Sequence, residues 1–148
     1  MTALNAPRIA RLLGGKRLLG REVRSTADLE SVVREGIPYR SYLYLVKHVA
    51  ATAEQRSVVE RLIVPRTTRL RREREGRLSR EESERAERVA RLRAMAEQVF
   101  ESAADAVDFL YAPHPLLEGA TPAERANTDL GARRVEAILD RLEYSLPV

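Results

Sequence analysis

The chain has 148 residues, which fits one compact domain or two very small ones with a common core, and its hydrophobic fraction of 44% excludes wholesale disorder. It contains no cysteine, which excludes disulfides and fits a reducing cytoplasm, and no apolar run approaches the roughly 20 residues of a membrane span. The net charge of +4 is unevenly distributed, because residues 1–93 carry 22 basic and 12 acidic side chains and residues 94–148 carry 4 and 10. Basic surfaces suit phosphate and acidic ones repel it, so we expect the two parts to bind different partners.

Residues 1–26 are expected to form an ordinary N-terminal arm or helix, since they lack the apolar core and the small-residue cleavage site of a signal peptide. A short helix should start at the cap Ser25-Thr26 and end at Gly36. Pro38 should open a second helix, because the apolar residues after it recur at the spacing of one helix face. These residues are Tyr42, Leu45, Val46 and Val49.

A third helix and an arginine-rich segment follow. Thr52 and Gln55 have the spacing of a capping box, which predicts a helix start. Pro65 comes after a very short break and favours a further helix start. Residues 66–77 contain six arginines and only two glutamates, and Gly76 should interrupt this helix. The residues predicted to be buried on the third helix are Val58, Val59 and Leu62.

A helix, a short break and an arginine-rich helix form the pattern of a helix-turn-helix motif. The second helix of such a motif lies in the major groove, where polar side chains reach base edges and arginines bind phosphates. A solvated charged helix without a ligand is the alternative interpretation. Ile63 stands where many of these motifs have glycine, so a wider turn is expected. The candidate DNA-binding residues are Arg66, Thr67, Thr68, Arg69, Arg71 and Arg72.

The longest predicted helix comes next. Ser79 and Glu82 form a second capping-box pattern, which predicts a helix that runs to about Phe100. Its charged side chains, including the pair Glu81-Glu82, are expected to be solvated. The residues on its apolar side are Ala86, Val89, Ala90, Met95, Val99 and Phe100.

After Ser102 the composition becomes more apolar and acidic. A short helix is predicted over Ala103–Tyr111, and the prolines of residues 113–119 exclude regular helix there. Thr121 and Thr128 should cap a short helix and a final helix. This segment either closes the core, or its last residues form an exposed apolar patch for a partner. The predicted apolar face of the final helix comprises Leu130, Val135, Ile138, Leu139 and Leu142.

Catalysis finds little support in the sequence. His48 lies beside a core stripe and His114 lies between two prolines, and these are the only histidines. There is no glycine-rich phosphate loop and no close set of histidine and carboxylate residues. We therefore expect neither an enzyme nor a metal site nor a cofactor.

Two longer motif blocks stand out. The first is Val64-Pro65-Arg66-Thr67-Thr68-Arg69-Leu70-Arg71-Arg72, and it continues through Gly76-Arg77-Leu78-Ser79 to Glu82-Ser83 and Arg85. The second comprises Phe109-Leu110, Pro113-His114-Pro115-Leu116, Gly119, Thr121-Pro122, Gly131-Ala132-Arg133-Arg134-Val135 and Leu139-x-Arg141-Leu142-Glu143-Tyr144. With Gly36-Ile37-Pro38, these blocks resemble the Xre/MbcA/ParS-like antitoxins of RES–Xre type II toxin–antitoxin systems over roughly residues 27–148.

The chain departs from this family pattern at three places. Phe109 stands where family members commonly carry tryptophan, which keeps an aromatic side chain. Ser145 replaces a more usual glycine, which makes a positive backbone φ less accessible in the tail. Arg69 followed by Leu70 shifts the apolar position of the second motif helix by one residue.

The resemblance implies an all-α fold with an N-terminal helix-turn-helix region, a long connecting helix and a small helical C-terminal toxin-binding region. The corresponding segments are an N-terminal arm or helix at 1–26, the helix-turn-helix DNA-binding region at 27–78, the connecting or dimerisation helix at 79–101 and the toxin-binding domain at 102–148.

In function, the resemblance implies a cytoplasmic homodimer that covers the active site of a RES-domain, NAD-degrading toxin and represses its own operon by binding operator DNA. One alternative is a stand-alone helix-turn-helix transcription regulator whose residues 103–148 only dimerise. Another is an interaction protein that has lost DNA binding. The candidate toxin-binding residues are Arg133, Arg134, Arg141, Glu143, Tyr144, Ser145, Leu146, Pro147 and Val148.

Overall fold

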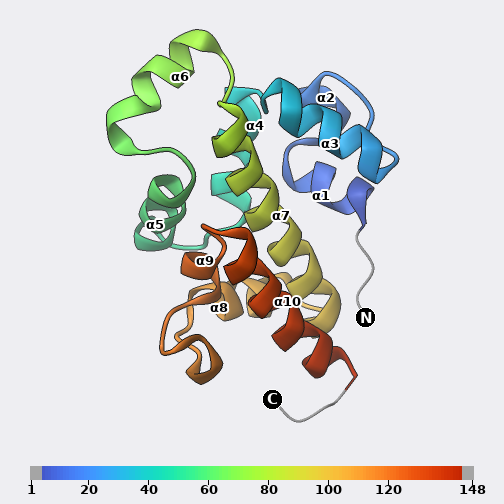
Figure 1. Cartoon of the computed structure of the whole chain (residues 1–148), viewed down its shortest axis with the longest axis vertical. Helices are drawn as coiled ribbons and strands as arrows, with labels where there is room; N and C mark the ends of the chain where they lie inside the picture. The colour runs from blue at the N-terminus through green and yellow to red at the C-terminus, as the bar shows by residue number, and fades with distance from the viewer. Residues whose placement is uncertain (1–4, 145–148) are drawn as a thin grey trace.

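The computed structural model describes residues 5–144, and within them the fold is built from α-helices and two short 3-10 turns, which confirms the all-α prediction. Figure 1 shows the long helix α7 (Arg80–Phe100) running through the centre of the molecule, with the other helices around it. The helices before it are α1 (Ala6–Leu12), α2 (Gly15–Leu19), α3 (Thr26–Glu35), α4 (Tyr39–His48), α5 (Ala53–Ile63) and α6 (Arg69–Glu75), with the turn η1 (Arg66–Thr68) between the last two. Those after it are α8 (Ala103–Tyr111), α9 (Pro122–Arg125) and α10 (Asp129–Glu143), with η2 (Pro115–Leu117) between α8 and α9.

The helix starts follow from local capping. At Ser25, Thr52, Ser79 and Thr121 the capping side chain accepts a hydrogen bond from the third helical N–H, and the third side chain accepts one from the cap N–H. These reciprocal bonds satisfy backbone donors that a helix N-terminus otherwise leaves unpaired. The predicted starts of α3, α5, α7 and α9 are thereby confirmed.

Helix α7 connects the two halves of the chain. Helices α1, α3, α4 and α5 pack on it from the N-terminal side, and α8 and α10 pack on it from the C-terminal side. Its most deeply buried positions include the small residues Ala86, Ala90 and Ala96, which allow the neighbouring helices to approach closely. As a result, one hydrophobic core extends from Ala6 to Leu139.

A short antiparallel bridge fixes the end of α6 against the start of α4. The Tyr39 N–H donates to the Gly76 carbonyl at 2.9 Å, and the Leu78 N–H donates to the Ile37 carbonyl at 2.8 Å. Gly36 has a φ of 98°, and a Cβ there would lie 2.6 Å from the Leu78 carbonyl oxygen. Only glycine therefore fits this crossing of two backbone segments.

Several predictions about burial were wrong. Glu82, expected in solvent, is only 4% exposed, whereas Leu130, expected on the buried face of α10, is 72% exposed. Val58 and Leu62 are half-buried, and the fully buried positions of α5 are Val59 and Ile63.

Candidate DNA-binding and toxin-binding surfaces

The second helix of the predicted helix-turn-helix motif consists of η1 and α6. Helix α5 ends at Ile63, and Val64 and Pro65 are extended before η1 begins. Ile63 and Val64 are fully buried, so the turn is anchored in the core. Figure 1 shows α6 projecting from one end of the molecule, beyond the start of α7.

Helix α6 is attached by polar contacts. It has no buried residue, and Leu70, its one large apolar side chain, is 59% exposed. Arg69 reaches back to α5, where Nη1 lies 3.1 Å from Glu60 Oε2 and Nε donates to the Val64 carbonyl at 3.3 Å. Arg72 reaches toward α7, where Nε lies 2.6 Å from Glu82 Oε1. Two arginines thus replace the apolar contacts that would hold an amphipathic helix.

Glu82 joins the cap of α7 to this arginine contact. Its Oε1 accepts from the Ser79 N–H at 2.9 Å as well as from Arg72 Nε. Burial by itself raises the pKa of the Glu82 carboxyl, but the hydrogen bonds and charge of Arg72 and the Ser79 bonds outweigh it and lower this pKa below its usual value. Glu82 is therefore an ionised side chain that is buried with its counter-charge, and it ties α6 to the first turn of α7.

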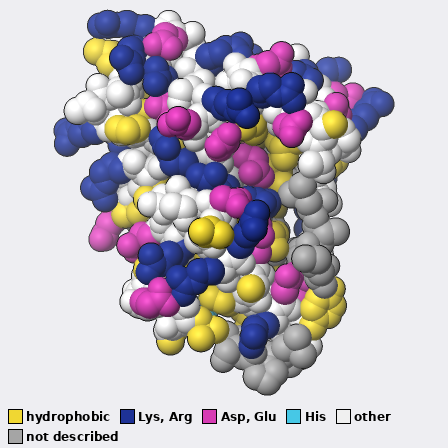
Figure 2. Space-filling model, viewed as in Figure 1, with side chains coloured by type: hydrophobic (Ala, Val, Ile, Leu, Met, Phe, Trp, Pro, Cys, Tyr) yellow, Lys and Arg dark blue, Asp and Glu magenta, His cyan; other side chains and the backbone are white. Residues whose placement is uncertain are grey.

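The six candidate DNA-binding residues divide into two groups. Thr68, Arg69 and Arg72 face the protein, and the Thr68 hydroxyl donates to the Pro65 carbonyl at 2.9 Å. Arg66, Thr67 and Arg71 are exposed, and Arg71 has only a long contact of 3.7 Å to Glu75. Arg74, a further arginine of this run, is also exposed on α6. Figure 2 shows Lys and Arg side chains over this end of the molecule, interspersed with Asp and Glu side chains.

The loop before α9 is held by a carboxylate–arginine cluster. Arg134 of α10 donates through Nη1 to Glu118 at 2.9 Å and through Nη2 to the Leu116 carbonyl at 2.8 Å. Arg125 donates to the Leu117 carbonyl at 3.0 Å and to Glu118 at 3.3 Å. The hydrogen bonds from Arg134 lower the pKa of the Glu118 carboxyl. This cluster, Glu118 with Arg125 and Arg134, fixes the loop against α10.

The candidate toxin-binding residues lie along α10 and beyond it. Arg133 is exposed and lies 3.0 Å from Asp129, and Arg134 belongs to the loop cluster. Arg141, Glu143 and Tyr144 lie at the end of α10, where Glu143 accepts from Gln98 at 3.3 Å and Tyr144 is 54% exposed. The remaining candidates are Ser145, Leu146, Pro147 and Val148, which lie outside the described residues.

Two leucines of the C-terminal region are exposed in addition to the candidate toxin-binding residues. Leu116 lies in the loop, and its carbonyl accepts from Arg134, while Leu130 lies one turn before Arg134 on α10. The buried residues Val135, Ile138 and Leu139 define the core face of α10. Extending that spacing backward leads to Gly131 and Ala132, so the helical period could have identified Leu130 as exposed.

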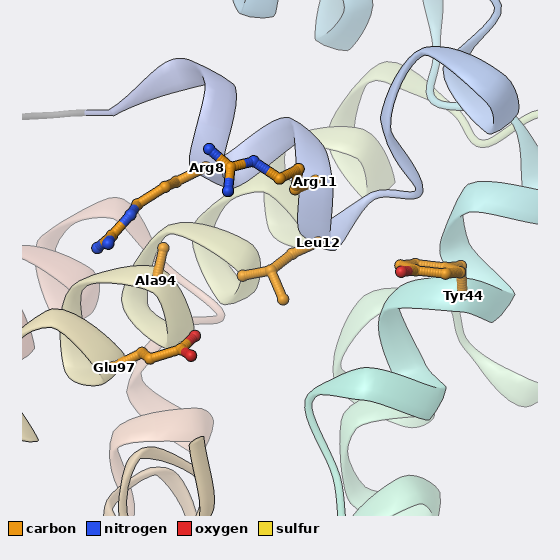
Figure 3. Close-up of a pocket in the computed structure, with 6 residues that line it drawn as sticks. All are labelled: Arg8, Arg11, Leu12, Tyr44, Ala94 and Glu97. Carbon is orange, nitrogen blue, oxygen red and sulfur yellow. The ribbon is translucent and has the colours of Figure 1, made fainter. Parts of the chain in front are cut away.

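The described part of the chain has a surface hollow between three helices, and His48 stacks on one of the residues that line it. Figure 3 shows a hollow of about 260 Å³ between α1, α4 and α7 that is lined by Arg8, Arg11, Leu12, Tyr44, Ala94 and Glu97. His48 stacks on Tyr44 with ring centroids 3.9 Å apart. Within residues 5–144, no group of three or more histidine and carboxylate side chains is placed to hold a metal ion. None of the helices described is both long and apolar enough to span a bilayer.

Comparison with known proteins matches both halves of the chain to one family. Residues 28–91 match the antitoxin Xre-like helix-turn-helix domain, and residues 95–144 match the antitoxin Xre/MbcA/ParS C-terminal toxin-binding domain. The chain is also similar to the antitoxin Xre of Pseudomonas putida, with 30% identity over 118 residues that cover 80% of this chain and 72% of the relative. The protein therefore belongs to the Xre antitoxin family, with a helix-turn-helix domain followed by a toxin-binding domain.

Proposed function

We propose that this antitoxin acts in the cytoplasm and neutralises a RES-domain, NAD-degrading toxin by covering the entrance of the toxin's active site with its C-terminal region. The observation that carries the proposal is the toxin-binding domain match over residues 95–144, which ends where α10 presents the exposed Tyr144. The RES class is supported by the two sequence blocks that resemble the antitoxins of RES–Xre systems. The chemistry on NAD belongs to the toxin, and this chain supplies only contacts.

The exposed apolar residues of the C-terminal region support a binding surface there. Leu116 and Leu130 flank the Arg134–Glu118 contact, and Tyr144 lies at the far end of α10. Contiguous apolar side chains that are exposed and rimmed by polar residues are typical of protein–protein interfaces. Because the loop cluster and the core of α10 hold this surface in place, little ordering is required when the toxin binds.

The test measures cellular NAD while the RES-domain product of the neighbouring gene is expressed, alone or with this protein. NAD should fall with the toxin alone and recover on co-expression. A truncated chain without residues 144–148 should fold normally and fail to restore NAD. Full recovery with the truncated chain would contradict a toxin contact at this end, and a neighbour that leaves NAD and growth unchanged would contradict the RES-toxin partner.

We propose further that the protein binds its operator as a homodimer and represses its own operon. Arg66, Thr67 and Arg71 are the residues assigned to DNA, since they are the candidates with solvent-exposed side chains. Arg71→Ala should weaken operator binding and lower the dependence of log affinity on log salt by about one phosphate contact. Arg133→Ala, which removes an exposed arginine from α10, is the control and should leave this slope unchanged.

A wild-type protein that shows no operator shift at physiological salt would restrict the function to toxin binding. Operator binding with an unchanged slope in Arg71→Ala would assign the DNA contact to other residues. If the protein is a stand-alone regulator whose C-terminal region only dimerises, it should bind the operator but neutralise no toxin. The NAD measurement and the operator shift therefore distinguish the three functions.

A further inference from the structure

The N-terminal helix pair α1–α2 lies outside both family matches, which begin at residue 28. Residues 5–20 contain four cations and no aspartate or glutamate. Helix α1 buries Ala6, Ile9 and Ala10 and packs on α7, so the pair belongs to the folded body of the protein. This segment is folded and basic, and neither proposed function assigns a role to it. The four cations are Arg8, Arg11, Lys16 and Arg17.

A tight glycine turn sets the direction of α2. Gly14 and Gly15 have φ values of 94° and 65°, which side chains rarely allow. A Cβ on Gly14 would lie 2.3 Å from Cδ1 of Leu18, so the turn also requires the space that glycine leaves. Leu19 is buried, while Lys16 and Arg17 are exposed. The turn therefore holds two adjacent cations in solvent on a fixed helix.

These cations lie at the same end of the molecule as α6. Arg40, in the first turn of α4, donates through Nε to the Leu18 carbonyl at 2.7 Å. The start of α4 is in turn bridged to the end of α6 through Tyr39 and Gly76. Leu19 ends α2, and Arg77 directly follows the C-cap of α6. Both residues line one hollow of about 290 Å³, so the ends of these two helices are adjacent. Figure 1 shows α2 and α6 at one end, with α4 between them.

Three of the cations at this end form no ion pair in the described part of the chain. Lys16, Arg17 and Arg40 form no ion pair with any carboxylate of residues 5–144. The acids that follow the pair in the chain are paired with other arginines, since Glu22 contacts Arg24 at 3.0 Å and Glu35 contacts Arg21. Arg24 lowers the pKa of the Glu22 carboxyl most, and the charge of Lys16 adds a smaller lowering. We call Lys16, Arg17 and Arg40 the N-terminal basic cluster. A fixed group of cations without ion pairs beside a recognition helix is suited to a polyanion with closely spaced charges.

From this placement we propose that the N-terminal basic cluster is a second DNA-binding site, which contacts the phosphate backbone beside the groove that α6 enters. The inference rests on the proposed operator binding and extends it to a segment outside the helix-turn-helix domain. Contacts to phosphate carry no sequence information, so the cluster should contribute affinity and orientation, while α6 should contribute sequence preference. Double-stranded DNA is the ligand, because the cluster shares one end of the molecule with the recognition helix.

The test compares two double variants of the full-length protein that lose the same charge. Lys16→Gln/Arg17→Gln removes two exposed cations of the N-terminal basic cluster. Arg8→Gln/Arg11→Gln removes two cations from α1 that line the hollow at Ala94 and Glu97. Ala94 and Glu97 lie roughly 20–25 Å along α7 from the end where α6 joins it, because α7 rises about 1.5 Å per residue.

The expected result is a loss of about two phosphate contacts in Lys16→Gln/Arg17→Gln only. Each phosphate contact contributes about 0.9 to the slope of log affinity against log salt. The ratio of wild-type affinity to variant affinity should therefore fall about twelvefold when the salt concentration rises from 0.05 to 0.2 M. The ratio between operator and unrelated DNA should stay unchanged, and so should the thermal unfolding midpoint. The control variant should keep the slope of the wild type.

The possible failures are distinguishable. A wild-type slope in Lys16→Gln/Arg17→Gln, together with a reduced slope in Arg71→Ala, would overturn the inference and leave the proposed operator binding intact. An equal loss of slope in Arg8→Gln/Arg11→Gln would show an effect of overall charge and would also overturn it. A wild type that binds no DNA would overturn both proposals.

Discussion

Helix α6 and the C-terminal region are attached to the same central helix in different ways. The C-terminal region buries large apolar side chains completely, among them Leu110, Leu117 and Leu139. Helix α6 buries none of its residues and is held by the contacts of Arg69 and Arg72 with glutamates of α5 and α7. Apolar burial stabilises a region without fixing directions, whereas a buried ion pair fixes geometry and adds little net stability.

This difference explains how one arginine-rich helix can be held in place and still keep several arginines exposed. Arg69 and Arg72 are three residues apart and therefore share the face of the helix that meets the protein. Arg66, Arg71 and Arg74 are exposed. The helix thus keeps a fixed position without an apolar face, and its remaining arginines are available to phosphate and base edges.

The largest expected effect on stability comes from the apolar packing of the C-terminal region. Leu139→Ala removes a fully buried side chain from α10 and should lower the free energy of unfolding by about 2–5 kcal/mol. Leu70→Ala, the matched change on α6, should alter it by less than about 0.5 kcal/mol because Leu70 is exposed. Urea unfolding followed by circular dichroism measures both. Equal losses would show that α6 contributes apolar packing after all.

The next effect concerns the ion pair of α6. Arg72→Ala leaves Glu82 buried without its partner and should cost about 1–3 kcal/mol of stability. If Arg72 positions the helix, operator affinity should fall while the salt slope stays that of the wild type, in contrast to Arg71→Ala. A slope reduced by one contact in Arg72→Ala would instead assign Arg72 directly to DNA. A double-mutant cycle with Glu82→Gln should give a coupling of about 0.5–3 kcal/mol.

The same pair predicts a dependence of stability on pH. The pKa of Glu82 is lowered in the folded protein, so its stabilising contribution is complete above the pKa of an unfolded glutamate and is lost as the pH falls through the folded value. The difference in unfolding free energy between the wild type and Glu82→Gln should be constant from pH 7 to about pH 5 and should shrink below that. Urea unfolding at each pH measures it. A difference that grows toward acid would contradict an ionised Glu82.

The smallest effect is expected at the loop cluster of the C-terminal region. Arg134→Ala removes the contacts to Glu118 and the Leu116 carbonyl, which are exposed to solvent and therefore weak. Global stability should change little, but amide hydrogen exchange in residues 116–120 should become faster. Arg133→Ala, whose partner Asp129 lies on the same helix, should leave that exchange unchanged.

The sequence by itself determined the helical elements and most of their boundaries. The caps at Ser25, Thr52, Ser79 and Thr121 form hydrogen bonds to residues three positions away, so neighbouring residues suffice to predict them. The arginine run also marked the second helix of the predicted motif, and the sequence blocks marked the family.

Only the tertiary structure decided which charges are buried and which apolar side chains are exposed. The hydrogen-bond partners of Arg69, Arg72 and Arg40 lie 9, 10 and 22 residues away in the sequence. The directions of the turns between these residues and their partners are not specified by any local pattern. The burial of Glu82 and the adjacency of α2 to the end of α6 depend on the same long-range packing against α7. Local hydrogen bonds set where each helix begins, and the common core sets which of its faces remain available for a partner.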